Sequence, residues 1–237
     1  MNSKHVDAVV WSQKQFFSSG ATLSYEARMN ALSKLESAIK KHEQEIYTAL
    51  NTDLGKSETE SFMCEVGLVQ SEISWMKKNL KKLMKRQKVK TPMSQFAADS
   101  FRSPSPYGTV LIMSPWNYPV LVSLSPMVAA LAAGNTVVLK PSSYSPATSG
   151  VIQAMLEDAF PSEYVCVITG GRTENESLLQ SLRKFALSLV NILCKIRITG
   201  KLSMRSIIGV FWDLSIRKRS FTEGVAMIPA VALNLRL

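Results

Sequence analysis

The first half of the chain carries its apolar residues at helical spacing. Residues 5–19 and 23–52 are predicted to form helices, separated by a break at Ser19 and Gly20. Thr22 and Ser24 are candidate N-caps for the second helix. Its apolar positions recur at steps of three and four residues and share one face: Met29, Leu32, Leu35, Ile39, Ile46 and Leu50. After a polar turn at residues 53–60, a third helix is predicted from about Glu58 through Leu83.

Beyond Pro92 the pattern changes to short, continuously apolar segments rich in β-branched residues. Such segments, bounded by Gly, Pro or Asn, are typical of strands buried on both faces of a parallel sheet. They are residues 108–114 ("GTVLIMS"), 135–142 ("NTVVLKPS") and 164–171 ("YVCVITGG"), with helices predicted between them at 120–133 and 147–160. This alternation predicts an α/β fold, in which N-terminal helices pack on a Rossmann-like parallel-sheet dinucleotide-binding domain.

Ligands of such sheets bind at the carboxyl ends of the strands, so the residues that follow each strand are candidate site residues. The first strand is followed by "SPWNYP", residues 114–119. Two prolines stiffen this turn, which allows Asn117 to present its NH2 group to a developing negative oxygen. The alternative is an ordinary turn with a buried Trp116.

The other two strand ends are less specific. Lys140 ends the second strand and is placed to serve a ribose hydroxyl or a phosphate, although a lysine at a strand end is also commonly just solvated. Gly170 and Gly171 follow the third strand and are compatible with the close approach of a dinucleotide. They form neither a GxGxxG motif nor a Walker A loop.

Composition narrows the class of protein. With 237 residues, 46% of them apolar, the chain is long enough for one large domain or two smaller ones and is not disordered in composition. No apolar run reaches about 18 residues, the length that spans a membrane, and residues 1–11 contain no apolar core of a secretory signal. The odd, sparse set of cysteines (Cys64, Cys166, Cys194) indicates a reducing compartment, so we expect a cytoplasmic protein without a metal site.

The net charge of +10 is unevenly distributed. Residues 1–182 hold 18 Lys and Arg against 16 Asp and Glu, whereas residues 183–237 hold 10 against only 2. Because no nucleic-acid-binding motif accompanies this charge, we do not expect a nucleic-acid partner. A second basic run lies within residues 77–90, at the end of the third predicted helix. A solvated face next to the helix C-terminus explains most of that run, and anion binding is the alternative.

From about Val9 to Leu179 the chain resembles the aldehyde dehydrogenase superfamily, most closely its class 3 branch for fatty or aromatic aldehydes. The resemblance rests on "QKQFFSSGAT", "ALNTDLGKS", "PYGTVLIMSPWNYP", "ALAAGNTVVLKPSSYSP" and the "VITGG" strand, in the order and spacing of the family. It implies oxidation of aldehydes to carboxylic acids with NAD or NADP. In the family, a Cys thiolate attacks the carbonyl, hydride passes to the nicotinamide, and a water activated by Glu releases the acid.

The resemblance also implies roles for single residues. Asn117 matches the family's oxyanion-stabilising Asn, while Trp116 and Tyr118 match positions at the nicotinamide end and the substrate funnel. Lys140 matches the Lys that binds the adenosine ribose.

Two further positions match the cofactor site. Gly170 matches the glycine near the adenine. Ser143 stands where the family has a Glu that takes the ribose hydroxyls. A neutral Ser removes the repulsion that a 2′-phosphate meets there, so NADP becomes at least as plausible as NAD.

The family pattern fails at about residue 183. The "FTGS" motif that faces the pyrophosphate is replaced, and "ITGK" (198–201) echoes it too late. The sequence has neither the "ELGG" segment of the general base nor the "GQ-x-C" segment of the nucleophile. Cys64 is expected to be a core thiol, and Cys166 to have a raised pKa inside its strand. Cys194 has no family counterpart.

These departures divide the chain into an aldehyde dehydrogenase N-terminal, cofactor-binding region (1–182) and an aberrant or divergent basic tail (183–237). We expect the tail to result from a frameshift, intron read-through or an alternative end, and a basic amphipathic segment that docks on an anionic surface is the alternative. We expect an incomplete dinucleotide-binding domain with an unpaired sheet edge, weak NAD or NADP binding and no turnover by this chain alone. The competing hypothesis is a non-catalytic binding protein, a truncated subunit that pairs with full-length chains or forms a homo-oligomer.

Overall fold

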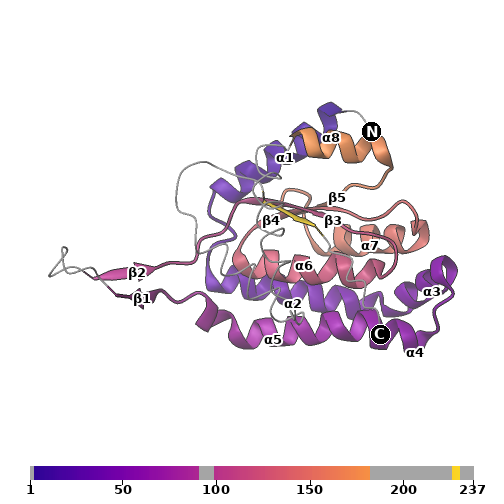
Figure 1. The fold of residues 1–237 in the computed structure, drawn as a ribbon, viewed down its shortest axis with the longest axis horizontal. Coiled ribbons are helices and arrows are strands. Elements are labelled where there is room, and N and C mark those ends of the chain that lie inside the picture. The colour runs from indigo at the N-terminus through magenta and orange to yellow at the C-terminus, as the bar shows by residue number, and fades with distance from the viewer. Residues whose placement is uncertain (1–2, 91–98, 182–225, 230–237) are drawn as a thin grey trace.

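The computed structural model describes residues 3–90, 99–181 and 226–229. Its centre is a parallel sheet with the strand order β5-β4-β3-β6, covered by helices on both faces (Figure 1). The strands are β3 (Thr109–Met113), β4 (Thr136–Lys140), β5 (Val165–Val167) and β6 (Ala226–Pro229). In the register, Val110 lies opposite Val137 and Val138 opposite Cys166. The predicted α/β class and the parallel sheet are confirmed.

The strand β6 gives an outcome that the sequence pattern did not predict. Residues 226–229 pair in parallel with β3, with Val110 opposite Ala226 and Met113 opposite Pro229. The expectation that this sheet edge stays unpaired is therefore wrong for these positions. The "ITGK" echo and Cys194 lie outside the described residues.

Alternate residues of each strand point to opposite faces, as in any pleated strand. On one face, Leu111 and Val138 pack with Val6, Val10 and Leu178, which come from α1 (Ser3–Ser18) and α8 (Arg172–Ser181). On the other face, Val110, Ile112, Val137 and Leu139 belong to the main core. That core includes α6 (Pro119–Ala133) and α7 (Pro146–Ala159), the two helices that connect the strands.

A second helical layer covers α6 and α7. It consists of α2 (Tyr25–Lys41), α3 (Glu43–Leu54) and α5 (Gly67–Leu83), whose apolar faces contribute Leu32, Leu35, Ile39, Ile46 and Ile73 to the main core. The single helix predicted over 23–52 is wrong, because His42 (φ −102°, ψ 14°) ends α2 and precedes α3. Ser24 is the N-cap of α2, as predicted, and its side chain accepts a hydrogen bond from the Ala27 N–H.

The third predicted helix is also interrupted. It consists of α4 (Glu58–Ser61), the π-helical segment η1 (Phe62–Val66) and α5. Cys64 lies in η1 and is partly exposed, so the expectation of a core thiol there is wrong. Glu65, in the same segment, is fully buried. Such π-helical turns occur frequently at functional sites.

The C-terminus of α6 depends on a glycine. Gly134 adopts φ +89°, and an added Cβ would lie 2.9 Å from Nε of the buried Arg28. Arg28 donates to the Ala132 carbonyl at 3.4 Å, and the Thr22 hydroxyl donates to the Gly134 carbonyl at 2.7 Å. These contacts fix the end of α6 against the start of α2. Thr22, predicted as a possible N-cap, has this different role.

A two-stranded arm extends from the body of the molecule (Figure 1). It consists of β1 (Gln87–Val89) and β2 (Ser100–Arg102), which pair in antiparallel fashion with Lys88 opposite Phe101. Within the described part of the chain, no helix is long and apolar enough to cross a membrane. Across the same described ranges, no group of three His, Cys, Asp or Glu side chains is arranged to hold a metal ion.

Candidate active site at the carboxyl edge of the sheet

The two best candidate segments leave the sheet side by side. Met113 and Lys140 are opposite each other at the carboxyl ends of β3 and β4, and the Ser114 N–H donates to the Lys140 carbonyl at 3.2 Å. The turns after the two strands, residues 114–118 and 141–145, therefore start from the same edge. This is where ligands of open α/β sheets bind.

The first turn presents polar and aromatic side chains. Trp116 is 52% exposed and Tyr118 is 41% exposed, so the alternative of an ordinary turn with a buried Trp is wrong. Asn117 is half-buried, and its Oδ1 has no hydrogen-bond partner among the described residues. The base of the turn is held by a 2.6 Å hydrogen bond between the hydroxyls of Ser114 and Ser123. The turn is anchored while the amide of Asn117 retains unused hydrogen-bonding capacity.

Lys56 holds this turn from the other side. Its Nζ donates to the Asn117 backbone carbonyl at 3.2 Å and lies 4.1 Å from the centroid of the Tyr118 ring. The same ammonium forms an ion pair with Glu65 Oε1 at 2.6 Å, and both side chains are buried. Charge-assisted hydrogen bonds of this kind are stronger than neutral ones. Lys56 therefore holds the carbonyl of the Asn117–Tyr118 peptide and contacts the Tyr118 ring.

The second carboxylate oxygen of Glu65 caps helix α6. Oε2 accepts hydrogen bonds from the N–H groups of Val120 at 2.8 Å and Leu121 at 3.2 Å. The first N–H groups of a helix lack partners within the helix, and a negative charge there is stabilised by the helix dipole. One buried carboxylate thus connects Lys56 to the first turn of α6.

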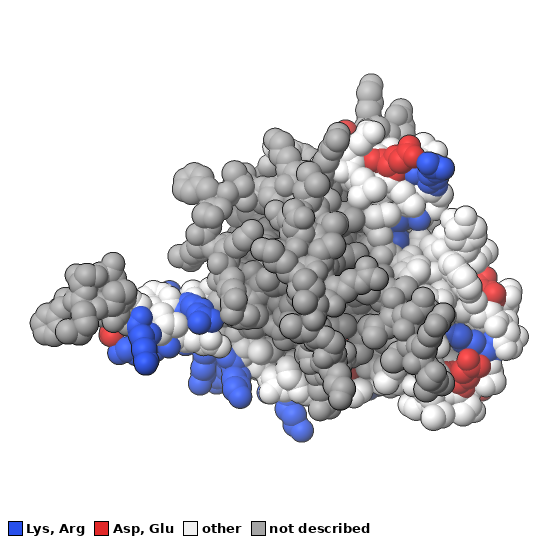
Figure 2. All heavy atoms as spheres, viewed as in Figure 1, with Lys and Arg blue, Asp and Glu red and all other residues white. Residues whose placement is uncertain are grey.

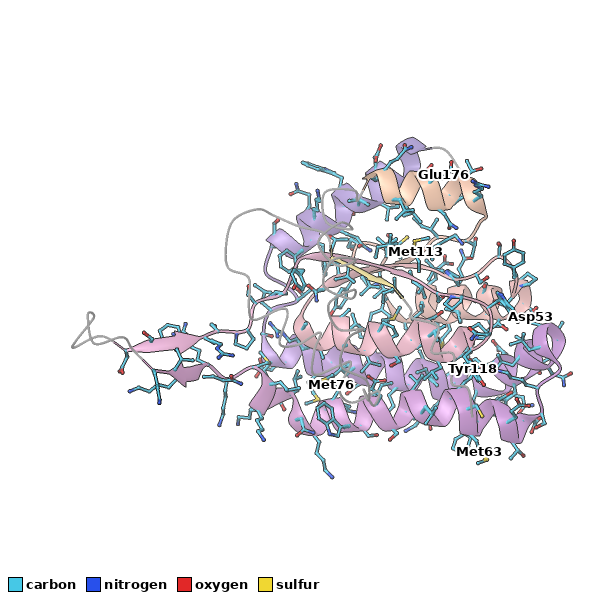
Figure 3. All side chains as sticks on the ribbon, in the orientation of Figure 1. Asp53, Met63, Met76, Met113, Tyr118 and Glu176 are labelled. Atoms are coloured by element: carbon cyan, nitrogen blue, oxygen red, sulfur yellow. The ribbon has the colours of Figure 1, made fainter. Side chains whose placement is uncertain are left out.

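The carboxylate of Asp53 caps the start of α7 in the same way. It accepts from the Ala147 N–H at 3.2 Å, and from the Thr148 N–H and hydroxyl at 2.7 Å each. In Figure 3, Asp53 and Tyr118 lie toward the same end of the molecule, whereas Met76 lies toward the other end. The polar turn at 53–56 therefore caps α7 directly through Asp53 and reaches the start of α6 through the ion pair of Lys56 with Glu65.

The sequence interpretation missed all three of these residues as site-forming groups. Asp53 and Lys56 stand in "ALNTDLGKS", which served only as evidence of resemblance, and their polar surroundings are typical of a solvated turn. Glu65 occupies an otherwise helical segment, and it contacts residues 55 and 56 positions away in sequence. The one signal in the sequence was that Glu65, a charged residue, lies on a helix face predicted to be buried.

Lys140 is buried rather than solvated, with 3% of its surface exposed. Its Nζ donates to the Pro141 carbonyl at 2.7 Å. Burial lowers the pKa of Lys140, and the nearby negative charge of Glu174 partly opposes that shift. The ammonium is therefore a desolvated donor at the edge of the sheet.

Ser143 lies in the next turn and is exposed beside Tyr144, which is 80% exposed. The turn is closed by the Ser149 hydroxyl, which donates to the Ser142 carbonyl at 2.7 Å. Ser145 Oγ is buried and lacks a hydrogen-bond partner within the described ranges. The carboxyl edge therefore combines a buried cation with buried polar atoms that have no partner, a donor and acceptor set that fits the sugar and phosphates of a dinucleotide.

Gly170 allows the chain after β5 to pass close to α8. It adopts φ +142°, and an added Cβ would lie 2.5 Å from Glu174 Cγ. The Gly171 N–H donates to Glu174 Oε2 at 2.8 Å, which caps the start of α8 in the manner of a capping box. Gly170 thus lies after the end of β5, as the sequence predicts, and close to the Glu174 carboxylate. The charge of the same carboxylate acts to raise the pKa of Lys140.

Residues 1–190 match the family model described as "Aldehyde dehydrogenase family". The chain belongs to the aldehyde dehydrogenase family. It is 37% identical over 174 residues to 4,4'-diaponeurosporen-aldehyde dehydrogenase of Staphylococcus aureus, a match that covers 73% of this chain and 38% of that protein. It is 40% identical over 178 residues to aldehyde dehydrogenase family 3 member H1 of Arabidopsis thaliana, covering 75% and 37%. These relatives confirm the resemblance to class 3.

The solved structures agree. The structure described as the substrate-bound state of Staphylococcus aureus AldH superposes with a TM-score of 0.73 at 37% identity, covering 76% of this chain and 39% of that one. The chain therefore spans less than two fifths of the length of these relatives. Residues 1–190, which match the family model, contain the Asn117 turn, the Lys140 turn and Gly170.

The two described cysteines, Cys64 and Cys166, lie outside the two turns. Cys166 is in the middle of β5, where burial raises the pKa of its thiol, as predicted, with Glu157 adding to the shift. Cys64 is in η1. A raised pKa disfavours the thiolate that a nucleophile requires.

Proposed function

We propose that this chain serves the NAD(P)-dependent oxidation of aldehydes to carboxylic acids, supplying the cofactor-binding and oxyanion-stabilising part of the site. The observation that carries the proposal is the parallel pairing that starts the Asn117 turn and the Lys140 turn from one sheet edge. Bound NAD or NADP would supply the hydride acceptor at this edge. Residues 1–182 are the region that performs this task.

Asn117 is the oxyanion-stabilising group in this proposal. Its side-chain NH2 donates to the oxygen of the aldehyde carbonyl as negative charge develops there. Its backbone carbonyl is held by Lys56, so the amide is positioned before the reaction. Preorganised donors of this kind typically contribute about 10²–10³ in kcat.

Lys140 binds the adenosine ribose in this proposal, and Ser143 and Gly170 line the same part of the cofactor site. Because Ser143 is neutral where the family has Glu, we expect NADP to bind no more weakly than NAD. Trp116 and Tyr118 line the nicotinamide end and the substrate funnel, and their exposure leaves them accessible.

A second candidate role is non-catalytic. The sequence has no "ELGG" or "GQ-x-C" segment, and the described cysteines lie outside the Asn117 and Lys140 turns. A chain of this kind would bind cofactor weakly and act as a subunit that pairs with full-length dehydrogenase chains or with itself.

Ligand-observed NMR on the full chain tests the cofactor part of the proposal. Saturation-transfer signals from NAD and NADP are expected for the natural chain, with Kd values of about millimolar or weaker because the pyrophosphate-facing "FTGS" motif is replaced. Lys140→Met, which keeps the aliphatic stem, removes the signals. Lys14→Met, at an exposed position, keeps them. Equal signals from both variants would contradict the assignment of Lys140.

A further inference from the structure

The cations of the described body are concentrated in one place. Residues 77–90 hold eight Lys and Arg and no Asp or Glu. The rest of residues 1–182 holds ten Lys and Arg against sixteen Asp and Glu. Figure 2 shows the result, with blue atoms gathered along the arm and the adjoining end of α5. Within residues 1–182, the positive charge is therefore segregated into the segment 77–90, and the remaining residues of this region have a net negative charge.

Helix geometry brings these lysines together. The buried face of α5 consists of Val69, Ile73, Met76 and Leu80. At 100° per residue, the opposite face of α5 carries Lys78, Lys81 and Lys82, and Lys85 follows two residues after the helix ends; all four are exposed. Arg86, Lys88 and Lys90 continue the positive charge onto the arm and are exposed as well. We call these seven residues the basic surface.

Most of the basic surface lacks an acidic partner. Within the part of the chain that the structure describes, no carboxylate forms a salt bridge with Lys78, Lys81, Lys82 or Lys85. Lys88 pairs with Asp99 at 2.6 Å, but both side chains are 75% exposed. The dipole of α5 accounts for cations in its last turn and not for those on the arm beyond it.

Exposed aromatic side chains accompany the cations. Trp75 is 37% exposed and precedes Lys78 by three residues and Lys82 by seven, so it borders the same face of α5. On the arm, Phe101 is 53% exposed, and the Arg86 guanidinium lies 4.7 Å from the centroid of its ring. Lysines that flank Trp and Phe are typical of segments that lie at the boundary between lipid headgroups and acyl chains.

We propose that the basic surface docks this protein on a bilayer of anionic phospholipids. Charge complementarity supplies the long-range attraction, and Trp75 and Phe101 supply apolar contact at the headgroup level. Seven of the eight cations in residues 77–90 are Lys, whereas recognition of nucleic acids favours the planar fork of Arg. The proposal goes beyond aldehyde oxidation and does not depend on it.

Vesicle flotation with the full chain tests the proposal. Vesicles of phosphatidylcholine alone and vesicles that contain about one third phosphatidylglycerol are compared at low and at physiological salt. Binding is expected to the anionic vesicles only and to weaken with salt. The Lys78→Gln, Lys81→Gln, Lys82→Gln, Lys85→Gln variant is expected to lower the partition coefficient by nearly three orders of magnitude, since each of the four lysines near the surface contributes about fivefold.

Two matched controls separate this surface from other positive charge. Neutralising Lys14, Lys34, Lys40 and Lys41, which are exposed elsewhere, is expected to leave binding within about threefold, since they lie off the basic surface. Neutralising Lys201, Arg217, Lys218 and Arg219 tests whether residues 183–237 carry the binding.

Fluorescence quenching tests the contact of Trp75 with the lipid. With brominated lipids, quenching of tryptophan fluorescence is expected to fall in the Trp75→Phe variant.

Three results would overturn the proposal: equal binding to neutral vesicles, unchanged binding of the α5 variant, or loss of binding only when the residues of the 183–237 set are neutralised. Tighter binding to a duplex oligonucleotide than to anionic vesicles at the same salt would assign the basic surface to nucleic acid instead. Circular dichroism of each variant shows that the fold is retained.

Discussion

Lys56 and Glu65 form a buried ion pair, 2.6 Å from Nζ to Oε1, that connects the Asn117 turn to the first turn of α6. Neither residue lies in the segment that carries Asn117. Their contacts determine where that segment leaves the sheet, because one atom of the pair holds the Asn117 carbonyl and another holds the Val120 N–H.

Removing one partner of this pair is expected to be strongly destabilising. Lys56→Met leaves a buried carboxylate without its counter-charge, which costs about 3–5 kcal/mol in the free energy of unfolding. Lys40→Met removes the exposed pair of Lys40 with Glu36 and is expected to cost about 1 kcal/mol or less. Urea titrations of both variants make the comparison. Similar midpoints for the two would show that the buried pair does not hold the turn.

Gly134→Ala is expected to destabilise the fold, whereas Gly150→Ala is not. Gly134 has a positive φ, and an added Cβ would meet Arg28. The expected cost is about 1–3 kcal/mol. Gly150 lies inside α7 with open space around its Cα, so alanine there is expected to stabilise by about 0.5–1 kcal/mol. Thermal unfolding of the two variants gives opposite changes in Tm; a fall in both would mean that α7 does not tolerate a side chain at 150.

Much of the fold could be predicted from local pattern, and much of the site could not. The β-branched runs identified β3, β4 and β5 because such runs are specific for buried parallel strands. The break at His42 and the π-helical segment around Glu65 could not be predicted, because the apolar spacing continues through both. Asn117 and Lys140 could be predicted from their places at strand ends. Lys56 could not, because it supports the Asn117 turn through a hydrogen bond to a residue 61 positions away in the sequence.

Glu72 makes stability depend on pH. Burial raises the pKa of this carboxyl to about 7, although the hydrogen bond from Ser125 lowers it in part. Its folded-state pKa exceeds the ordinary value of 4.5, so the folded state holds the proton more tightly. The stabilisation is present in full below about pH 4.5 and is lost as the pH rises to about 7, by about 3 kcal/mol at most.

Glu72→Gln tests this prediction, because glutamine cannot ionise and can still accept the hydrogen bond from Ser125. Between pH 5 and pH 8 the variant is expected to lose the decline in unfolding free energy that the natural chain shows. A decline of the same size in the variant would assign the pH dependence to other groups.

The full chain is expected to form no NADH or NADPH from aliphatic or aromatic aldehydes. The reason is that no cysteine occupies the family's "GQ-x-C" motif and that burial disfavours the thiolate of Cys166. Absorbance at 340 nm with either cofactor measures this, with the Staphylococcus aureus relative as the active control. Turnover that disappears when Cys166 or Cys194 is alkylated would contradict the prediction.

The oxyanion role of Asn117 is tested most directly in a chimera. Residues 1–181 of this chain replace the corresponding part of the Staphylococcus aureus relative, to which the matched region is 37% identical. The chimera is expected to oxidise aldehydes with NAD or NADP, and Asn117→Ala is expected to lower kcat by about 10²–10³. Asn30→Ala, at an exposed position of α2, is expected to leave kcat unchanged. An active chimera whose kcat is not changed by Asn117→Ala would contradict the proposed function of the turn.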